Sequence, residues 1–321
     1  MKKYFSWDIL FFIALLLVLP PLLGDSYFFE TVNIVGIYAI AVVGLNLILG
    51  VTGLLSLGHA AFFGLGAYTT GYLSTAMGWP PLLTVALAVL FVALVAYLVA
   101  LPLLRLTGYS LALGTLGLGV IVYTLINGGG ALTGGSNGMT GVPKFSVGGF
   151  TFDTFSESFY LIWLTLFVVY VLSKNLMNSK EGRAFTAIHS DEDVAAAYGI
   201  PVFRYKLKIF VAGCALSGLA GSYLAHYMQF ISPQVVSLEA SIDILIMGFL
   251  GGFGSFLGPL FGSFVFQLIP ELSTAWHLEE LETLVKGILL LAILLFFPLG
   301  IQGGVHRLGA WLRSRKKKEA A

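Results

Sequence analysis

The segment Leu82–Leu104, LLTVALAVLFVALVAYLVALPLL, decides the fold class, because it runs for 23 residues without one charged side chain. The segment Tyr109–Ile126, YSLALGTLGLGVIVYTLI, follows it and is also free of charge. At about 1.5 Å of rise per residue, helices of these lengths reach across a hydrocarbon core about 30 Å thick. Lipid offers the backbone no hydrogen-bond partners, so such segments must be helical. Both runs therefore predict membrane-spanning helices.

The composition of the whole chain supports the same fold class. Of the 321 residues, 58% are hydrophobic and only 10% are charged, and the mean hydropathy is +0.93. A soluble chain of this length would need far more charge on its surface. We predict an all-α integral membrane protein, a single polytopic helical bundle over residues 1–321 with about 8–10 transmembrane helices. The candidate passes lie at 9–23, 32–49, 55–75, 82–104, 109–127, 159–173, 207–231, 241–254, 257–270 and 284–299.

Basic residues give these passes a direction. With ten passes and a cytoplasmic N-terminus, 15 of the 17 Lys and Arg fall on the inner side, and only Lys144 and Lys286 lie elsewhere. This bias is the positive-inside pattern of membrane proteins. It predicts cytoplasmic N- and C-termini, an external loop at 127–158, a cytoplasmic loop at 173–208 and a basic cytoplasmic tail at 305–321.

Three further features limit the possible cellular compartments and partners of the chain. The first apolar segment follows Met1-Lys2-Lys3 like a signal peptide, but no small-x-small cleavage site follows Leu23, so we interpret it as a membrane anchor. The single Cys214 excludes an intramolecular disulfide. The basic run Arg313–Lys318 is typical of an anchor at anionic headgroups, and we expect no nucleic-acid partner.

Two glycine-rich stretches, 50–68 and 251–262, interrupt the apolar pattern. Glycine weakens helices and permits close backbone approach. Two interpretations stay open: tight helix packing through small residues, or broken helices that line a translocation path. His59 is the sharpest polar residue in the first stretch, and it is either a hydrogen-bonded structural residue or a substrate ligand.

Two polar segments differ from the rest. The run 133–143, TGGSNGMTGVP, predicts a shaped loop, which either docks a soluble partner or simply connects two passes. In the loop 173–208, Ser190 is a candidate N-cap with Asp193 in a capping-box-like role, and Gly199 with Pro201 ends the short helix. That helix is either an ordinary connector or a docking knob.

Several signatures of chemistry are missing from the sequence. It holds no Gly-x-x-x-x-Gly-Lys-Ser/Thr run, no His/Cys cluster with metal spacing and no Gly-x-Ser-x-Gly elbow. We therefore expect no catalytic residues, no cofactor and no metal. Charges within the spans are scarce, and Asp243 and Lys286 lie near outer ends. Coupled carriers commonly place carboxylates at mid-membrane, so the scarcity weighs against a secondary transporter.

Taken together, the motifs resemble those of branched-chain amino acid ABC transporter permeases, specifically the LivM-type subunit. The motifs are Leu45–Gly50, Gly53–Tyr68, Thr133–Gly138, Gly182–Phe185, Ala195–Ile200, Arg204–Lys206, Gly218–Gly221 and Gly248–Gly262. Such permeases carry a coupling pattern, Glu-Ala-Ala-x-x-x-Gly, with Ile ten residues after the Gly. Here Asp193-Val194-Ala195, Gly199 and Ile209 match it, with Asp for Glu and Val for Ala as departures. The resemblance implies ATPase coupling through Asp193, Ala195, Ala196 and Gly199.

The resemblance also implies the assembly and the mechanism. The chain would pair with a second, LivH-type permease in the bacterial inner membrane, above two cytoplasmic ATP-binding subunits that hydrolyse ATP. A periplasmic substrate-binding protein would deliver Leu, Ile or Val for alternating access, along a path lined by Ser56, Gly58, His59, Gly252 and Gly254. The alternatives are a urea or short-chain amide importer, a self-sufficient secondary carrier or channel, and a structural membrane scaffold.

Overall fold

The computed structural model describes residues 27–130, 132–255 and 257–275, with single positions at Phe12, Leu284, Gly287, Ile288 and Leu291. The passes expected at 9–23 and 284–299, and the tail 305–321, lie outside the described residues apart from those positions.

Long helices occupy every candidate pass within the described residues. They are α2 Tyr27–Leu45, α3 His59–Thr75, α4 Pro81–Leu103, α5 Tyr109–Gly128, α6 Phe155–Asn178, α9 Val202–Met228, α10 Leu238–Gly251 and α11 Gly258–Ala275, joined at one point by the shorter α7 Lys180–Ser190 and α8 Glu192–Ala197. Five stretches are long and apolar enough to cross a membrane: Phe28–Gly50, Pro81–Leu103, Tyr109–Gly128, Phe155–Asn178 and Val202–Met228. The prediction of an all-α membrane protein is confirmed.

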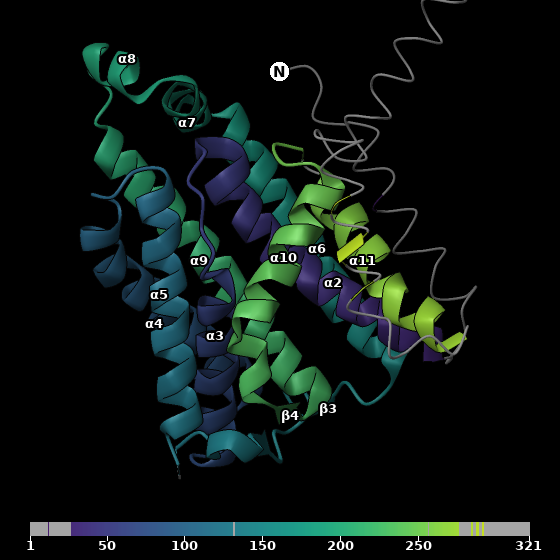
Figure 1. Cartoon of the computed structure of the whole chain (residues 1–321). Helices are drawn as coiled ribbons and strands as arrows, with labels where there is room; N and C mark the ends of the chain where they lie inside the picture. Colours follow the sequence, from purple (N-terminus) through teal and green to yellow (C-terminus); the bar gives the residue numbers. More distant parts are fainter. Residues whose placement is uncertain are drawn as a thin grey trace, which may run out of the picture.

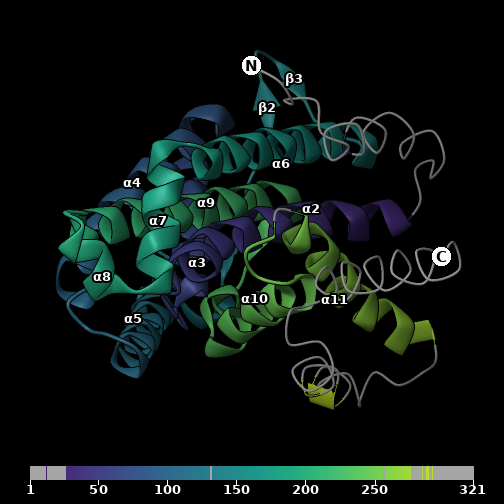
Figure 2. The ribbon, with the colours of Figure 1, turned by 90° about the horizontal axis from the view of Figure 1, so that it is seen from above.

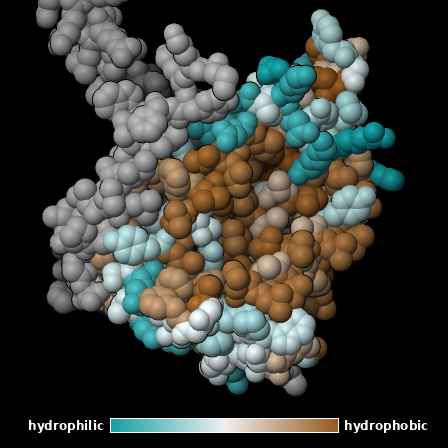
Figure 3. Space-filling model, turned by 180° about the vertical axis from the view of Figure 1, so that it is seen from behind, coloured by the Kyte–Doolittle hydropathy of each residue, from teal (hydrophilic) through white to brown (hydrophobic). Residues whose placement is uncertain are grey.

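Helices α2 and α9 form the centre of the bundle. Their apolar windows are 83% and 61% buried, whereas those of α4, α5 and α6 are only 28%, 28% and 33% buried. Figure 2 shows α2 between α6 and α9 on one side and α10 and α11 on the other. The outer helices expose leucines such as Leu90, Leu94 and Leu125. Figure 3 shows a broad hydrophobic band between hydrophilic ends, which suits contact with lipid or with another membrane subunit.

Glycines bring α9 unusually close to its two neighbours. A Cβ on Gly221 would collide with the carbonyl of Phe63 in α3, and one on Gly66 would collide with the backbone of Gly218. Gly213 meets the backbone of α2 in the same way. Small residues allow helices in lipid to pack backbone to backbone. The packing interpretation is therefore correct for the α3 part of the stretch 50–68.

The predicted shaped loop is confirmed at the end of the bundle opposite α7 and α8 (Figure 1). It contains the 3-10 helix η2 Gly135–Asn137 and three short strands, β1 Met139–Thr140, β2 Ser146–Val147 and β3 Phe150–Thr151. Strands β2 and β3 form a hairpin, and β1 pairs antiparallel with β4 Phe230–Ile231, just after α9. The 3-10 helix η3 Pro233–Val236 then leads into α10.

Two breaks depart from plain spanning helices. Helix α2 ends in a π-helix, η1 Asn46–Gly50, after which residues 53–58 are not helical and α3 begins at His59. In Figure 1 this purple connection runs back into the bundle, and α3 starts within it. The prediction that this pass begins at 55 is wrong, because the chain turns at Gly53 with a φ of 72°.

The second break separates α10 from α11. Gly252 and Gly254 have φ angles of 91° and 78°, which end α10 at Gly251, three residues before the predicted limit of that pass. Helix α10 has 14 residues and is therefore about 21 Å long, shorter than the hydrocarbon core of a membrane.

Candidate functional site

The segment 179–201, which contains the predicted coupling residues, has two sharply defined helix starts. Ser179 caps α7 by accepting from the backbone N–H groups of Glu181 and Gly182 at 3.1 and 3.3 Å. Asp191 caps α8, because its Oδ1 accepts from Asp193 N at 3.0 Å and from the next N–H at 2.9 Å. The prediction that Ser190 is the N-cap is wrong: Ser190 is the last residue of α7, and its hydroxyl donates to an α7 carbonyl.

The end of α8 follows the sequence prediction. Gly199 has a φ of 79°, and its N–H donates to the Ala196 carbonyl at 2.9 Å. The N–H of Ile200 donates to the Ala195 carbonyl at 3.1 Å. Left-handed glycine caps of this kind satisfy the last carbonyls of a helix. Pro201 then precedes α9 as its N-cap.

Helix α8 presents a small apolar surface at this end of the molecule. Ala195 is buried, whereas Asp193, Ala196 and Gly199 are exposed. Val194 and Tyr198 are 52% and 85% exposed and lie four residues apart, so they share one helix face. The sequence analysis missed this pair, although the spacing of two apolar residues in a polar loop was the signal that could have found it.

Side-chain contacts fix α7 and α8 to α9. Lys206, whose side chain is only 5% exposed, pairs with Glu192 at the start of α8. The Nζ of Lys208 donates to Oε1 of Glu181 in α7 at 2.7 Å. The buried ring of Phe185 meets the ring of Tyr205 edge-on, with centroids 5.5 Å apart. These three contacts attach the segment to α9 at the end of the bundle.

Three of the predicted path residues lie together where α3 begins inside the bundle. Ser56, Gly58 and His59 are all buried. Nε2 of His59 lies 3.2 Å from the Ala41 carbonyl, and the hydroxyl of Ser217 donates to the His59 carbonyl at 3.2 Å. Among the described residues, Nδ1 of His59 and Oγ of Ser56 have no hydrogen-bond partner.

Helix α5 touches the first break directly. The N–H of Leu57 donates to Oγ1 of Thr115 at 3.0 Å, and Gly58 lies so close to the Thr115 carbonyl that a Cβ there would collide. The break is therefore held between α3 and α5.

Asn46 joins the two glycine-rich breaks. Its Nδ2 donates to the Ser255 carbonyl at 2.8 Å, and its Oδ1 accepts from the Gly254 N–H at 2.8 Å. Gly252 is buried and Gly254 is exposed. The structure thus brings Gly254 of the second break to the end of α2. The hydrogen-bond contacts of His59 lie elsewhere, with α2 and α9. The sequence analysis missed Asn46, whose signal was an amide in an otherwise apolar run.

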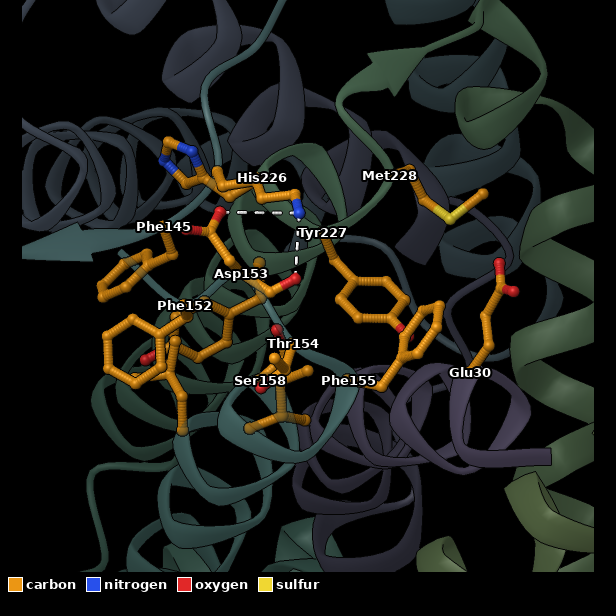
Figure 4. Close-up of a pocket in the computed structure, with 14 residues that line it drawn as sticks. Glu30, Phe145, Phe152, Asp153, Thr154, Phe155, Ser158, His226, Tyr227 and Met228 are labelled. Atoms are coloured by element: carbon orange, nitrogen blue, oxygen red, sulfur yellow. Dashed lines mark hydrogen bonds and ion pairs between the residues drawn. The ribbon is translucent and has the colours of Figure 1, made fainter. Parts of the chain in front are cut away.

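A separate pocket of about 160 Å³ opens at the other end of the bundle (Figure 4), and the sequence did not predict it. Its apolar walls come from the loop, α6 and α9. Lys144 donates to the Asp153 carbonyl at 3.0 Å and pairs with the Asp153 carboxylate at 3.6 Å. The hydroxyl of Thr151 donates to Asp153 and lowers the pKa of that carboxyl. Nδ1 of His226 lies 2.7 Å from the Pro143 carbonyl, which fastens the loop to α9.

Comparisons with known proteins agree on the family. Residues 27–294 match the family model for the branched-chain amino acid transport system / permease component. The chain is 31% identical to the high-affinity branched-chain amino acid transport system permease protein LivM of Escherichia coli (strain K12), over 91% of this chain and 74% of that protein. It is 26% identical to LivH of the same strain, over 86% of this chain and 94% of that protein.

A third relative is the permease protein BraD of Pseudomonas aeruginosa, which is 25% identical over 83% of this chain and 91% of that protein. No solved structure matches the chain. The matched residues include all of the described helices from α2 to α11, and the chain belongs to the family of branched-chain amino acid transport system permease components.

Proposed function

We propose that this chain is the LivM-type membrane subunit of an ATP-driven importer that moves Leu, Ile and Val across the bacterial inner membrane. The observation that carries the proposal is the 31% identity to LivM over 91% of the chain, together with the segment 179–201, which is attached to α9. The chain contributes the path and performs no bond-breaking chemistry, since ATP hydrolysis belongs to separate subunits.

Two cytoplasmic ATP-binding subunits dock beneath the complex, one of them on α8. The exposed pair Val194 and Tyr198 offers an apolar contact, and Asp193, Ala196 and Gly199 surround it. Seven of the eight described Lys and Arg lie near the α7–α8 end, which supports a cytoplasmic position for that end. Movement of the ATPases pulls α8, and the contacts to α9 carry the displacement into the bundle.

The substrate path runs past Ser56, Gly58 and His59 and is completed by Gly252 and Gly254. In the described state the first three residues are buried, as expected of a closed path. The unpaired Oγ of Ser56 and Nδ1 of His59 are free to meet the polar head of an amino acid when the breaks separate. The surrounding Leu, Val and Phe side chains suit a branched aliphatic side chain.

Two further partners complete the transporter. A LivH-type permease packs against the exposed apolar side of this chain, where Leu113, Ile121 and Leu125 of α5 stand 66%, 58% and 68% exposed. A periplasmic binding protein docks at the end formed by η2 and the β-strands. Both chain termini lie in the cytoplasm.

Reconstitution of this chain with the second permease, the two ATP-binding subunits and the binding protein in proteoliposomes tests the proposal. Leucine uptake should require ATP and the binding protein, and excess isoleucine or valine should compete while urea and acetamide should not. Inhibition by urea alone would contradict the assignment of branched-chain amino acids as the substrate. Robust ATP-free uptake by this subunit alone would instead identify a self-sufficient carrier.

A further inference from the structure

The π-helix η1 lies where three segments of the chain meet: α2, the second break and α7. π-helical turns are rare and are frequently found at functional sites. In η1 the residues Asn46, Leu47 and Ile48 are all buried. Their side chains reach different segments of the chain, so the turn is more than the end of α2.

On one side, the turn holds the second break. Gly254 and Ser255 lie between α10 and α11, so their backbone groups are outside any helical ladder. The carboxamide of Asn46 gives both groups a partner, with two hydrogen bonds of 2.8 Å. A Cβ on Gly50 would collide with the Gly254 nitrogen, so the two backbones are also in direct contact. Parting them would leave the buried amide of Asn46 without these two partners.

On the other side, the turn touches the segment 179–201. Leu47 and Val51 form one buried cluster with Phe185 of α7 and Ile209 of α9. The ring of His189, also in α7, lies 3.3 Å from the place a Cβ of Gly53 would take. A displacement of α7 therefore acts on η1 and on the start of the first break at once.

We propose that η1 is the joint through which α7 and α8 act on both breaks, with Asn46 as the positioning residue that makes the breaks move together. The inference rests on the proposed transport function for its physiological meaning. Asn46 touches no substrate in this account. It acts by tying Gly254 and Ser255 to the end of α2, so that the first break cannot shift without the second.

The variant Asn46→Leu tests the joint, since leucine has a similar size and makes neither hydrogen bond. The matched control is Asn33→Leu. Asn33 is also a buried asparagine of α2, and its Nδ2 donates to the Phe155 carbonyl at 2.9 Å and to the Tyr227 hydroxyl at 3.3 Å. Asn33 contacts neither break through these bonds, so it reports the general cost of losing a buried amide.

The first measurement is the ratio of leucine transported to ATP hydrolysed by the complete complex in proteoliposomes. We expect Asn46→Leu to lower this ratio about tenfold, the size of a typical coupling between sites, while hydrolysis continues. Asn33→Leu should leave the ratio unchanged. An unchanged ratio in Asn46→Leu, or an equal fall in both variants, overturns the inference.

If Asn46→Leu does not assemble, Asn46→Asp replaces it. This variant keeps the oxygen that accepts from Gly254 and replaces the amide that reaches Ser255. A lowered transport ratio supports the joint, and an unchanged ratio overturns it.

A second measurement needs no transported substrate. In a Cys214→Ala background, thiol labelling of Ser56→Cys and Leu257→Cys reports the opening of each break with and without ATP. In the parent complex both rates should respond, whereas Asn46→Leu should keep the response at position 56 and lose it at position 257. A retained response at both positions overturns the joint. If the parent complex imports no branched-chain amino acid but its breaks respond in this way, the proposed substrate fails and the joint stands.

Discussion

Single glycines set the distance between α9 and its neighbouring helices, so a larger side chain at one of these glycines should lower the stability of the protein. Gly221→Val places a branched side chain against the carbonyl of Phe63, and overpacking of this kind costs about 1–3 kcal/mol. We expect a lower midpoint of thermal unfolding in detergent. Gly117→Ala in α5 is the control, because nothing lies within 4 Å of its Cβ position, and it should be neutral or stabilising. Equal midpoints for the two variants would contradict the close contact.

Two ion pairs of the segment 179–201 should differ in how much they stabilise it. Glu192→Gln leaves Lys206, whose side chain is 5% exposed, without its carboxylate partner. A charge left unpaired in a half-buried pair costs about 1–3 kcal/mol. Glu181→Gln breaks a pair whose side chains are 42% and 59% exposed, which costs at most about 1 kcal/mol. Hydrogen exchange over residues 192–200 should accelerate strongly in the first variant and little in the second; equal acceleration would refute the difference.

The sequence predicted the secondary structure of the candidate coupling residues better than it predicted their contacts. Asp193, Ala195, Ala196 and Gly199 do lie on or just after a short helix, because a cap, alanines and a glycine are local signals. The choice of Ser190 over Asp191 failed, since both residue types cap helices and the end of α7 was not visible. The exposure of Tyr198 follows from the packing of α8 on α9, which no local pattern contains.

At the scale of the element, the exposed face of α8 should contribute to the affinity for the ATP-binding subunit and not to the stability of the fold. The double variant Val194→Ser with Tyr198→Ser removes two exposed side chains, so the thermal midpoint should not change. Affinity for the ATP-binding subunit should fall at least about tenfold, as for the loss of a small hot spot. Tyr109→Ser, an 86% exposed tyrosine at the start of α5, is the matched control and should bind normally. Full ATPase binding by the double variant would exclude α8 as the docking element.

The helices could be predicted because a long apolar run in a membrane must satisfy its own backbone hydrogen bonds, which a helix does. The breaks were predicted as glycine-rich stretches, but their geometry was not. Asn46 of the π-turn meets Gly254, 208 positions away along the chain, and Leu57 of the first break contacts Thr115 of α5. Sequence periodicity reports local structure and cannot contain such distant pairs.

At the scale of the whole molecule, the described helices alternate in direction, and the Lys and Arg residues gather at the end that this alternation assigns to one side. Arg105 follows α4, and Lys174, Lys180 and Arg183 follow or end α6, close to α7 and α8, while Lys144 lies in the loop at the far end. The charge count required only the order of passes along the chain, so a direction for every described helix could be predicted from the sequence. The exposed apolar surface of α4, α5 and α6 could not be predicted, because hydropathy does not tell an outer helix from a central one.

The arrangement makes a direct prediction about sidedness. Ser136→Cys in η2 and Tyr198→Cys after α8 place exposed thiols at opposite ends of the bundle. With Cys214 replaced by Ala, a membrane-impermeant maleimide added to intact spheroplasts should label position 136 and spare position 198. Inverted membrane vesicles should give the reverse pattern, because position 198 then faces the reagent. The bias of Lys and Arg toward the α8 end sets this direction. Labelling of position 198 in intact spheroplasts would invert the topology and remove α8 from the reach of any cytoplasmic ATPase.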